Sequence, residues 1–245
     1  MSLHHRPSSV FVIICCFMLL WCCSHRAHAH HPVADSVLHP KVVRTVPTQQ
    51  PMVALTFDDG PYPIYTPAIL RLLDEYHAHA TFFMIGTAIE QHPEIVREVV
   101  AQGHVVGNHT YTHPHDLRAC SPEQVHQELH QCAESIATIT GHQPSLFRAP
   151  CGRLNATIMH IATAQHYTVI GWTVCADHHE APTPEQMAYR VLTRVHPGAI
   201  ILLHDGRTNA RWKDVKATAL ILAELHRQGY QCVTLPELLA QTQTK

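Results

Sequence analysis

The chain has no block of basic residues and no excess of positive charge. Its 245 residues hold 17 Lys and Arg against 19 Asp and Glu, a net charge of −2. Because nucleic-acid-binding domains usually carry a basic patch or stripe, this balance argues against a nucleic-acid partner. The chain also has no internal repeat, and no glycine-rich phosphate loop follows its first predicted strand. The missing loop argues against a dinucleotide-binding fold.

No apolar run is long enough to span a bilayer comfortably. The run Val10–Cys23 has 14 residues, whereas a membrane-spanning helix needs about 20. It follows a polar, partly basic start and precedes Ala27–Ala29, which has the small-x-small form of a signal-peptidase site. We therefore expect residues 1–29 to be a signal peptide cleaved near Ala29, and the protein to be secreted or periplasmic. The alternative is a membrane anchor formed by the uncleaved segment.

Removal of this leader changes both the charge and the cysteine count. Residues 1–29 contain Arg6, Arg26 and no acidic residue, so 15 basic side chains then face 19 acidic ones, a net charge of −4. An odd number of cysteines leaves at least one thiol unpaired or intermolecular. The sequence predicts no particular disulfide among the five that remain, which are Cys120, Cys132, Cys151, Cys175 and Cys232.

Residues 30–50 are polar, contain proline and show no periodicity, so we expect an exposed linker there. From residue 51 to 245 short apolar runs alternate with helical patterns. This alternation without an internal break predicts one α/β domain with a parallel sheet, and an incomplete (β/α) barrel with about seven parallel strands fits best. The predicted strands are Met52–Phe57, Ala80–Ile85, His104–Val106, Leu146–Arg148, Thr168–Trp172, Ala199–Leu203 and Gln231–Thr234.

Helix boundaries follow from caps and glycines. Three pairs place an N-cap residue before a proline in the first helical turn, and Ser121 with Gln124 also fits a capping box. Glycines at three positions are expected to end helices. The cap pairs are Thr66-Pro67, Ser121-Pro122 and Thr183-Pro184, and the glycines are Gly103, Gly141 and Gly229.

The 24 histidines make histidine spacing a weak signal. Random placement would give about two His-x-x-x-His pairs, the false-positive risk of any short motif, and the chain has two. His126 and His130 lie beside the apolar stripe of the predicted helix 122–140, where a solvated face is expected. His109 and His113 follow a predicted strand instead.

Reactive side chains recur where predicted strands end. In a (β/α) barrel these ends meet at one rim, so their convergence indicates a functional site. Each group alone has a structural explanation, such as a turn or an ion pair, but five strand ends together are hard to explain that way. The residues at these ends are Asp58 and Asp59, His109 and His113, Arg148, Trp172 and Asp177, and His204 and Asp205.

Their chemistry indicates metal-assisted hydrolysis of an acyl group. Two imidazoles and one carboxylate, with a fourth position open for water, form a catalytic zinc arrangement. One aspartate of the adjacent pair would complete that set, and the second could act as a general base. A histidine on the far side could protonate a leaving group, and an arginine could hold the base ionised.

Five ordered motifs resemble those of the polysaccharide deacetylase family (carbohydrate esterase family 4, with the NodB homology domain), which includes rhizobial chitooligosaccharide deacetylases. They are TFDDGP, HTYTH, RAPCG, the Trp172–Asp177 segment and LLHDG, within Met52–Leu239. The resemblance implies a distorted, incomplete (β/α) barrel. It also implies that Asp58 is the general base, oriented by Arg148, and that His204 is the general acid. Asp59, His109 and His113 would bind the metal, and Thr110 would brace the loop that carries the two histidines. On the substrate side, the Cys151 N–H would donate to the oxyanion, Leu203 would contact the acetyl methyl, and Trp172 would line the pocket.

Two motifs depart from the family pattern. Cys151 stands where an aromatic residue is common, which preserves a backbone role but removes a stacking surface. In the fourth motif His178 occupies the usual aspartate position, and Asp177 lies one residue earlier. The support that Asp177 gives the site is therefore an open question.

The resemblance implies a zinc-dependent hydrolase, with another divalent metal such as cobalt as the alternative. We expect it to deacetylate N-acetylglucosamine-containing polysaccharides or oligosaccharides as a monomer, releasing acetate and a free amine. The nearest alternative is an O-acetyl polysaccharide esterase of the xylan type. The third hypothesis is a non-catalytic metal- or glycan-binding protein, but such a protein would not need Asp58 or His204.

Overall fold

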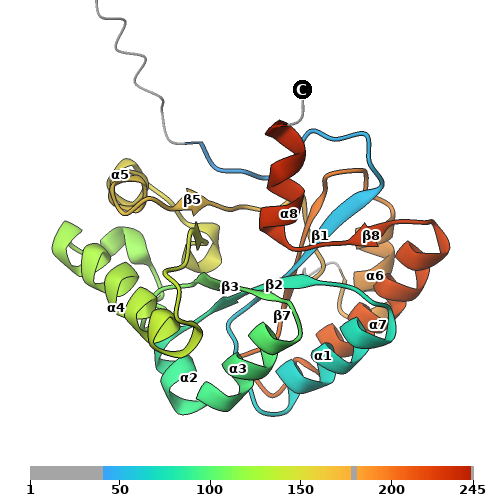
Figure 1. Cartoon of the computed structure of the whole chain (residues 1–245), viewed down its shortest axis with the longest axis horizontal. Helices are drawn as coiled ribbons and strands as arrows, with labels where there is room; N and C mark the ends of the chain where they lie inside the picture. Colours follow the sequence, from blue (N-terminus) through green and yellow to red (C-terminus); the bar gives the residue numbers. More distant parts are fainter. Residues whose placement is uncertain (1–40, 178–180, 244–245) are drawn as a thin grey trace, which may run out of the picture. The chain divides into compact units, whose positions relative to one another are not determined.

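The structure is a computed structural model that describes residues 41–177 and 181–243. The predicted signal peptide, residues 30–40 and His178 lie outside this part. Strands and helices alternate along the described chain (Figure 1). The strands are β1 (Met52–Asp58), β2 (Ala80–Met84), β3 (Val105–Asn108), β4 (Leu146–Phe147), β5 (Thr168–Val169), β6 (Val174–Cys175), β7 (Ile200–His204) and β8 (Gln231–Cys232).

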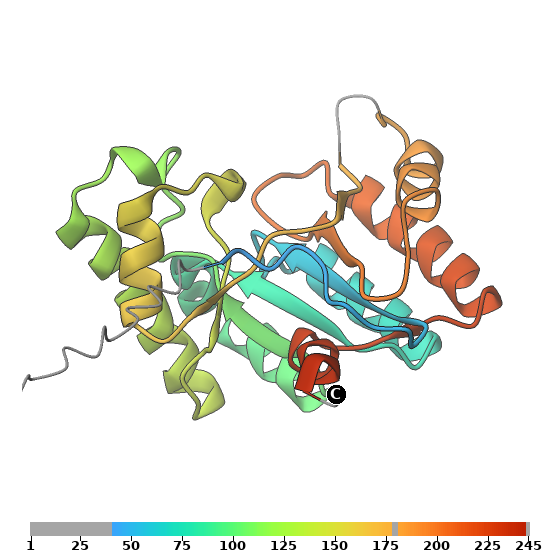
Figure 2. The same ribbon diagram turned by 90° about the horizontal axis from the view of Figure 1, so that it is seen from above.

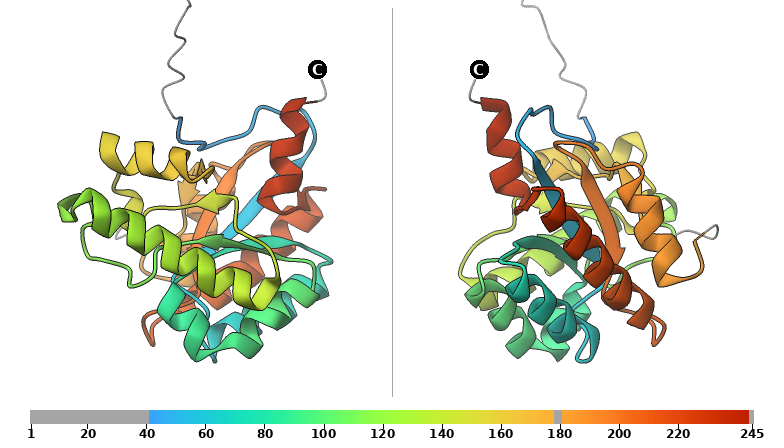
Figure 3. Two further views of the ribbon diagram at one scale, coloured as in Figure 1. Left: turned by 60° about the vertical axis from the view of Figure 1, so that its left-hand side comes forward. Right: turned by 90° about the vertical axis from the view of Figure 1, so that its right-hand side faces the viewer.

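Except for α8 (Leu235–Ala240), the helices cover the outer side of the sheet (Figure 3). Neighbouring helices pack in the order α5, α4, α3, α1, α7, α6, and α2 packs beside α3 and α4. Of these described helices, none is long and apolar enough to cross a membrane. The α-helices are α1 (Tyr65–Glu75), α2 (Gly86–Gln91), α3 (Pro93–Ala101), α4 (Pro122–Thr140), α5 (Ala156–Ala164), α6 (Pro184–Leu192), α7 (Trp212–Arg227) and α8 (Leu235–Ala240), with short 3₁₀ turns η1 (Leu117–Ala119), η2 (Pro150–Gly152) and η3 (Gln241–Gln243).

The sheet is parallel and open. Seven strands lie in the order β5-β4-β3-β2-β1-β7-β6, and β8 pairs with the start of β1. The path curls without closing, which confirms the predicted incomplete barrel. Each of the seven predicted strands has a counterpart, but the two-residue β6 was not predicted. Only four residues separate it from β5, so no separate apolar run marks it in the sequence.

Two apolar layers hold the sheet in place. The larger cluster lies between the sheet and the helices and includes Phe57, Phe82 and Leu203. The opposite face packs against α8 through Leu235 and Leu238. Because side chains alternate along a strand, every second residue of β1 and β7 contributes to each layer.

The residues just before β1 correct the exposed-linker prediction. Val43 donates its N–H to Val169 (2.9 Å), and Val46 donates its N–H to Gly198 (2.9 Å). The side chain of Val46 is buried. This extended segment runs between the β5 side and the β7 side of the sheet (Figure 2). The linker interpretation is therefore wrong for residues 43–46, because valines with backbone partners were mistaken for solvated chain.

Most helix caps are confirmed, and one is wrong. Ser121 and Thr183 both cap helices in full capping boxes, each followed by proline. Gly103, Gly141 and Gly229 adopt positive φ at or just after helix ends. Thr66 is no cap, since α1 starts at Tyr65. Its hydroxyl donates instead to a buried carboxylate, Asp205, at 2.6 Å.

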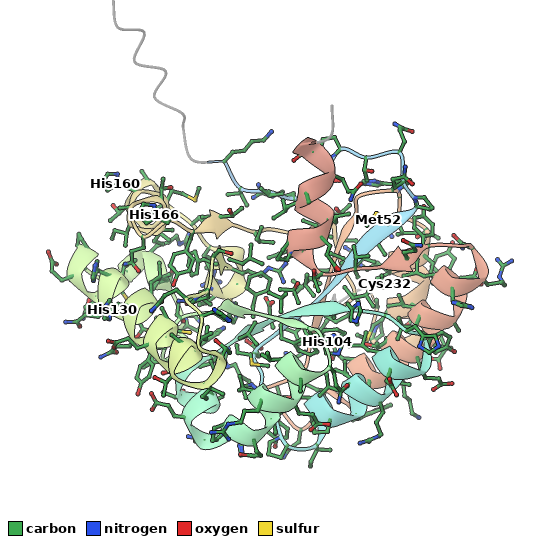
Figure 4. The ribbon with its side chains drawn as sticks, in the orientation of Figure 1. Met52, His104, His130, His160, His166 and Cys232 are labelled. Atoms are coloured by element: carbon green, nitrogen blue, oxygen red, sulfur yellow. The ribbon has the colours of Figure 1, made fainter. Side chains whose placement is uncertain are left out.

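The second histidine pair lies where the sequence predicted. His126 and His130 are exposed on α4, while Val125 and Leu129 of the same helix are buried. Figure 4 shows His130 on the outer side of that helix. The only described charged partner of His130 is Glu134 of the same helix, at 3.4 Å.

Candidate active site

The end of β1 places two adjacent carboxylates in different directions. Leu55 and Phe57 face the helices, so Thr56 and Asp58 face the inner side of the sheet. Asp59 follows with φ of 79°, a left-handed conformation that turns the chain. Only 4% of Asp58 and 7% of Asp59 is exposed. Two buried carboxylates this close together require compensating positive charge.

Arg148 supplies that charge for Asp58. Its Nη1 donates to Asp58 Oδ1 (2.7 Å) and to Thr56 Oγ1 (2.9 Å), and its Nη2 donates to the Gly171 carbonyl (2.9 Å). The guanidinium lies 4.2 Å from the centre of the Phe83 ring and is fully buried. Burial lowers the pKa of Arg148, while Asp58 opposes this shift. Arg148 therefore fixes one oxygen of Asp58 and leaves Oδ2 available.

Asp59 lies between the two histidines of the HTYTH motif. Its Oδ1 is 3.5 Å from His109 Nε2 and 3.3 Å from His113 Nε2. One ligand atom from each of the three residues lies within 4.8 Å of the others, as a shared metal ion requires. All three side chains are buried.

The tautomer of His109 fits a bound cation. Its Nδ1 lies 2.8 Å from the Arg148 carbonyl, which accepts a hydrogen bond from the Nδ1–H of the neutral ring. Nε2 then presents a lone pair to Asp59 Oδ1, and two acceptors at 3.5 Å attract each other only through a cation or a proton. A histidine that donates its second N–H to a backbone carbonyl is typical of metal ligands.

The charges of this triad are strongly coupled. Burial alone would raise the pKa of Asp59, but the neighbouring imidazoles of His109 and His113 outweigh it and hold the pKa well below its usual value. For His109, burial alone would lower the pKa, but Asp58 and Asp59 raise it. Arg207 donates to His113 Nε2 at 3.2 Å. A metal ligated by that nitrogen would displace this hydrogen bond, because both use the same lone pair.

The strand register places His204 beside Asp58. The two residues are direct partners in the parallel β1–β7 pair, so their side chains emerge on the same face. His204 donates its backbone N–H to Asp214 Oδ1 (3.1 Å), and its Nδ1 lies 3.8 Å from Asp177 Oδ2. Burial, followed by Arg211, lowers the pKa of His204 despite the nearby carboxylates.

Asp177 thus does reach the site, and Arg211 accompanies it. Arg211 Nη1 lies 2.6 Å from Asp177 Oδ2 and 3.5 Å from Asp214 Oδ2. Asp177, His204 and Asp214 form a second set of possible metal ligands, but the guanidinium already supplies a cation there. Sequence reasoning missed Arg211 and Asp214 because both follow the last motif.

Thr110 braces the metal loop only through its backbone. Its N–H donates to Asn108 Oδ1 (2.9 Å), and its carbonyl accepts from Gly86. Among the described residues its hydroxyl has no hydrogen-bond partner, so the bracing that Thr110 provides comes from its backbone, and another residue supplies the side-chain bracing. Asn108 takes that role, since its Nδ2 also donates to the Leu129 carbonyl (2.7 Å) and to Tyr167 (2.8 Å).

Leu203 points away from the site. It is a partner of Phe57 and packs in the helix-side core, so its predicted contact with an acetyl methyl is wrong. The period of two explains the error, because residues of β7 that share a face with His204 lie two apart. Leu202 has that parity and is 3% exposed. Counting back two residues from His204 would have identified it.

Cys151 and Trp172 form one wall beside the site. Cys151 has φ of 55° and is exposed, and its backbone N–H is not engaged in a hydrogen bond within the described chain. Trp172 packs so closely on Gly152 that an added Cβ would meet its ring at 2.4 Å. Its ring centre lies 5.9 Å from the Arg148 guanidinium. All five cysteines are free thiols, so the described residues contain no disulfide.

Comparison with known proteins agrees with this geometry. The sequence profile described as "Polysaccharide deacetylase" matches residues 45–170. A peptidoglycan-N-acetylglucosamine deacetylase of Bacillus cereus is 38% identical over 196 residues, covering 79% of this chain and 91% of the relative. A chitooligosaccharide deacetylase of Bradyrhizobium sp. is 36% identical over 197 residues, covering 76% and 90%. The crystal structure of the Bc1960 peptidoglycan N-acetylglucosamine deacetylase superposes with a TM-score of 0.77 at 31% identity, covering 80% of this chain and 92% of that one.

Proposed function

This chain belongs to the polysaccharide deacetylase family, and from that premise we propose that it is an exported, zinc-dependent enzyme that removes N-acetyl groups from N-acetylglucosamine-containing glycans. One observation carries the proposal. The buried Asp58–Arg148 pair lies next to a possible metal-binding triad, and His204 emerges beside Asp58 on the neighbouring strand. A base, an acid and a metal site within one group of strand ends are what amide hydrolysis needs.

Asp59, His109 and His113 would hold the metal, in keeping with a family whose deacetylases are generally metal-dependent. Zinc suits two imidazoles and a carboxylate, and cobalt is the alternative. A bound zinc would supply electrophilic activation of water and of the acetyl oxygen. Two protein groups that support this assignment are the Arg148 carbonyl, which orients His109, and Asn108, which fixes the loop.

Asp58 acts as the general base in this proposal. Arg148 holds Oδ1, so Oδ2 is the oxygen that can take a proton from water as the water oxygen attacks the acetyl carbon. Oδ2 lies 3.8 Å from His109 Nε2, on the side where the metal ligands gather. The unengaged N–H of Cys151 can donate to the oxyanion that develops.

His204 delivers the second proton. It donates to the sugar nitrogen as the carbon–nitrogen bond breaks, which yields acetate and a free amine. Leu202, on the same face as His204, offers an apolar surface to the acetyl methyl. Trp172, half-buried beside the site, offers a surface to the sugar ring.

Export is proposed from the leader pattern of residues 1–29, and the mature protein would then be secreted or periplasmic. A monomer suffices, because all the groups invoked come from one chain. Measurement of the mature N-terminus after expression in a secreting host tests the cleavage near Ala29. An intact leader would support the uncleaved anchor instead.

Acetate release from a glycan panel tests the activity. The panel contains chitin oligomers, peptidoglycan fragments and acetylated xylan, each assayed with zinc and after chelation. We expect release from N-acetylated substrates that stops on chelation and returns with zinc. Release from acetylated xylan alone would establish the O-acetyl esterase alternative. No release from any substrate by zinc-loaded protein would favour a non-catalytic binding protein.

A further inference from the structure

Building on the proposed function, we infer that Arg211 is a positioning residue that holds Asp177 against the acid His204. Arg211 precedes α7 and lies 34 residues from Asp177 in sequence. It belongs to none of the five motifs. Its effect on the reaction would pass through the carboxylates that it binds.

Arg211 is held from several directions. Besides its ion pairs with Asp177 and Asp214, its Nη2 lies 3.6 Å from Asp59 Oδ2 and its Nε donates to the Gly206 carbonyl at 3.2 Å. Its side chain is only 13% exposed. A planar guanidinium can serve several carboxylates at fixed angles, which the single ammonium of lysine cannot.

Asp177 depends on this contact. Its side chain is 44% exposed, and Arg211 is the only hydrogen-bonding partner of its carboxylate in the described residues. The oxygen that accepts from Arg211 at 2.6 Å is the one that lies 3.8 Å from His204 Nδ1. Without Arg211, nothing described would keep this carboxylate from turning into solvent.

The same guanidinium approaches a second carboxylate beside His204. Asp214 Oδ1 accepts the backbone N–H of His204, and its Oδ2 lies 3.5 Å from Arg211. His204 Nδ1 is buried and has no hydrogen-bond partner within the described chain, so a small inward movement of Asp177 would satisfy it. With Nδ1 directed at Asp177, Nε2 remains to donate a proton to substrate.

This arrangement accounts for the unusual fourth motif. Asp177 precedes the expected position by one residue, which His178 takes. An anchor on a different loop can compensate for such a shift, because it sets the position of the carboxylate independently of the local chain. Arg211 is that anchor.

The experiment compares two leaving groups. An N-acetylated chitin oligomer needs a proton on its departing nitrogen, whereas 4-nitrophenyl acetate releases a phenolate that departs without one. The variants are Arg211→Met, Arg211→Lys, Asp177→Asn and the Met/Asn double variant. Arg227→Met is the matched control, because Arg227 pairs with Glu224 on the exposed far end of α7. Each variant is assayed as zinc-loaded protein, and its metal content is measured.

We expect Arg211→Met to lower kcat on the chitin oligomer by about 10- to 100-fold, within the range for acid–base groups. Its rate on 4-nitrophenyl acetate and its zinc content should stay within about twofold of wild type. Arg211→Lys should recover part of the loss. The double variant should be no slower than the slower single variant, since residues acting as one unit are not additive. Arg227→Met should match wild type on both substrates.

An equal loss on both substrates, loss of zinc, or additive effects of the two substitutions would each overturn the inference. If Arg211→Met fails to fold, Arg211→Lys and Asp177→Asn carry the same comparison. Wild-type protein that hydrolyses neither substrate would refute the proposed function itself, a result distinct from any of these.

Discussion

The loops after β1 and β7 approach so closely that glycine at 206 is expected to be essential for the metal site. Asp205 donates its N–H to the Asp58 carbonyl at 3.0 Å. A Cβ on Gly206 would lie 2.0 Å from the Asp59 carbonyl oxygen and 2.3 Å from its carbon. Ordinary contacts of such an atom begin at 3.4 Å, so one backbone must move by more than about 1 Å before packing is restored.

The displaced backbone in Gly206→Ala is that of Asp59, a proposed metal ligand. Overpacking of this kind costs about 1–3 kcal/mol of folding free energy. A catalytic group misplaced by about 1 Å can cost on the order of 100-fold in rate. We therefore expect Gly206→Ala to lower zinc affinity and to reduce turnover by about 100-fold or more, with a modest loss of stability.

Gly141→Ala is the matched control. Gly141 ends α4 with φ of 76°, and nothing lies within 4 Å of a Cβ added there. Alanine in a left-handed conformation costs about 1–2 kcal/mol, so both variants should lose similar stability. Zinc titration, acetate release and thermal unfolding are measured for both. If Gly206→Ala kept zinc and turnover at the level of Gly141→Ala, the loop contact would not be what positions Asp59.

Three further predictions address the division of labour around the site. Asp58→Asn should keep zinc but lose about 10²- to 10⁴-fold in turnover, whereas Asp59→Ala should lose both; zinc loss in the first variant would mean that the two roles are reversed. Replacement of both His126 and His130 by alanine should leave zinc content and rate near wild type and change stability by about 0.5 kcal/mol or less. Loss of zinc in this variant would mean that the metal binds at this pair and not at the proposed site. Burial raises the pKa of Asp205 from its ordinary value of 3.8 to about 7, so its ionisation should destabilise the fold as pH rises through that interval. Asp205→Asn should weaken this pH dependence, which is at most about 1.4 kcal/mol per pH unit, in unfolding titrations.

The positions of the reactive side chains were predictable because a parallel sheet gathers strand ends. An apolar run ends at, or is followed by, each of Asp58, His109, Arg148 and His204. Their positions at strand ends were therefore enough to predict that they lie close together in space. The two histidine pairs were separated on the same basis. One follows a strand, and the other borders a helical stripe, although their spacing is identical.

The errors arose where the direction of a side chain or a distant partner decides the outcome. Leu202 and Leu203 are the same residue type and belong to the same motif. Only the pleat of β7 determines that Leu203 faces the core and Leu202 faces the site. Thr66, followed by Pro67, fits a helix cap by local rules, yet its hydroxyl donates a hydrogen bond to a buried carboxylate 139 residues away.

Arg211 shows most directly why local patterns were insufficient. Its contacts join the loop after β6, the loop after β1 and the start of α7, and no spacing rule links residues 59, 177 and 211. The motifs mark the groups that perform chemistry, because chemistry restricts residue type. A residue that only holds such a group can come from any loop that reaches it, so its sequence position carries little signal. The three-dimensional structure is therefore needed to identify the positioning residues, even where the reactive residues can be identified from the sequence.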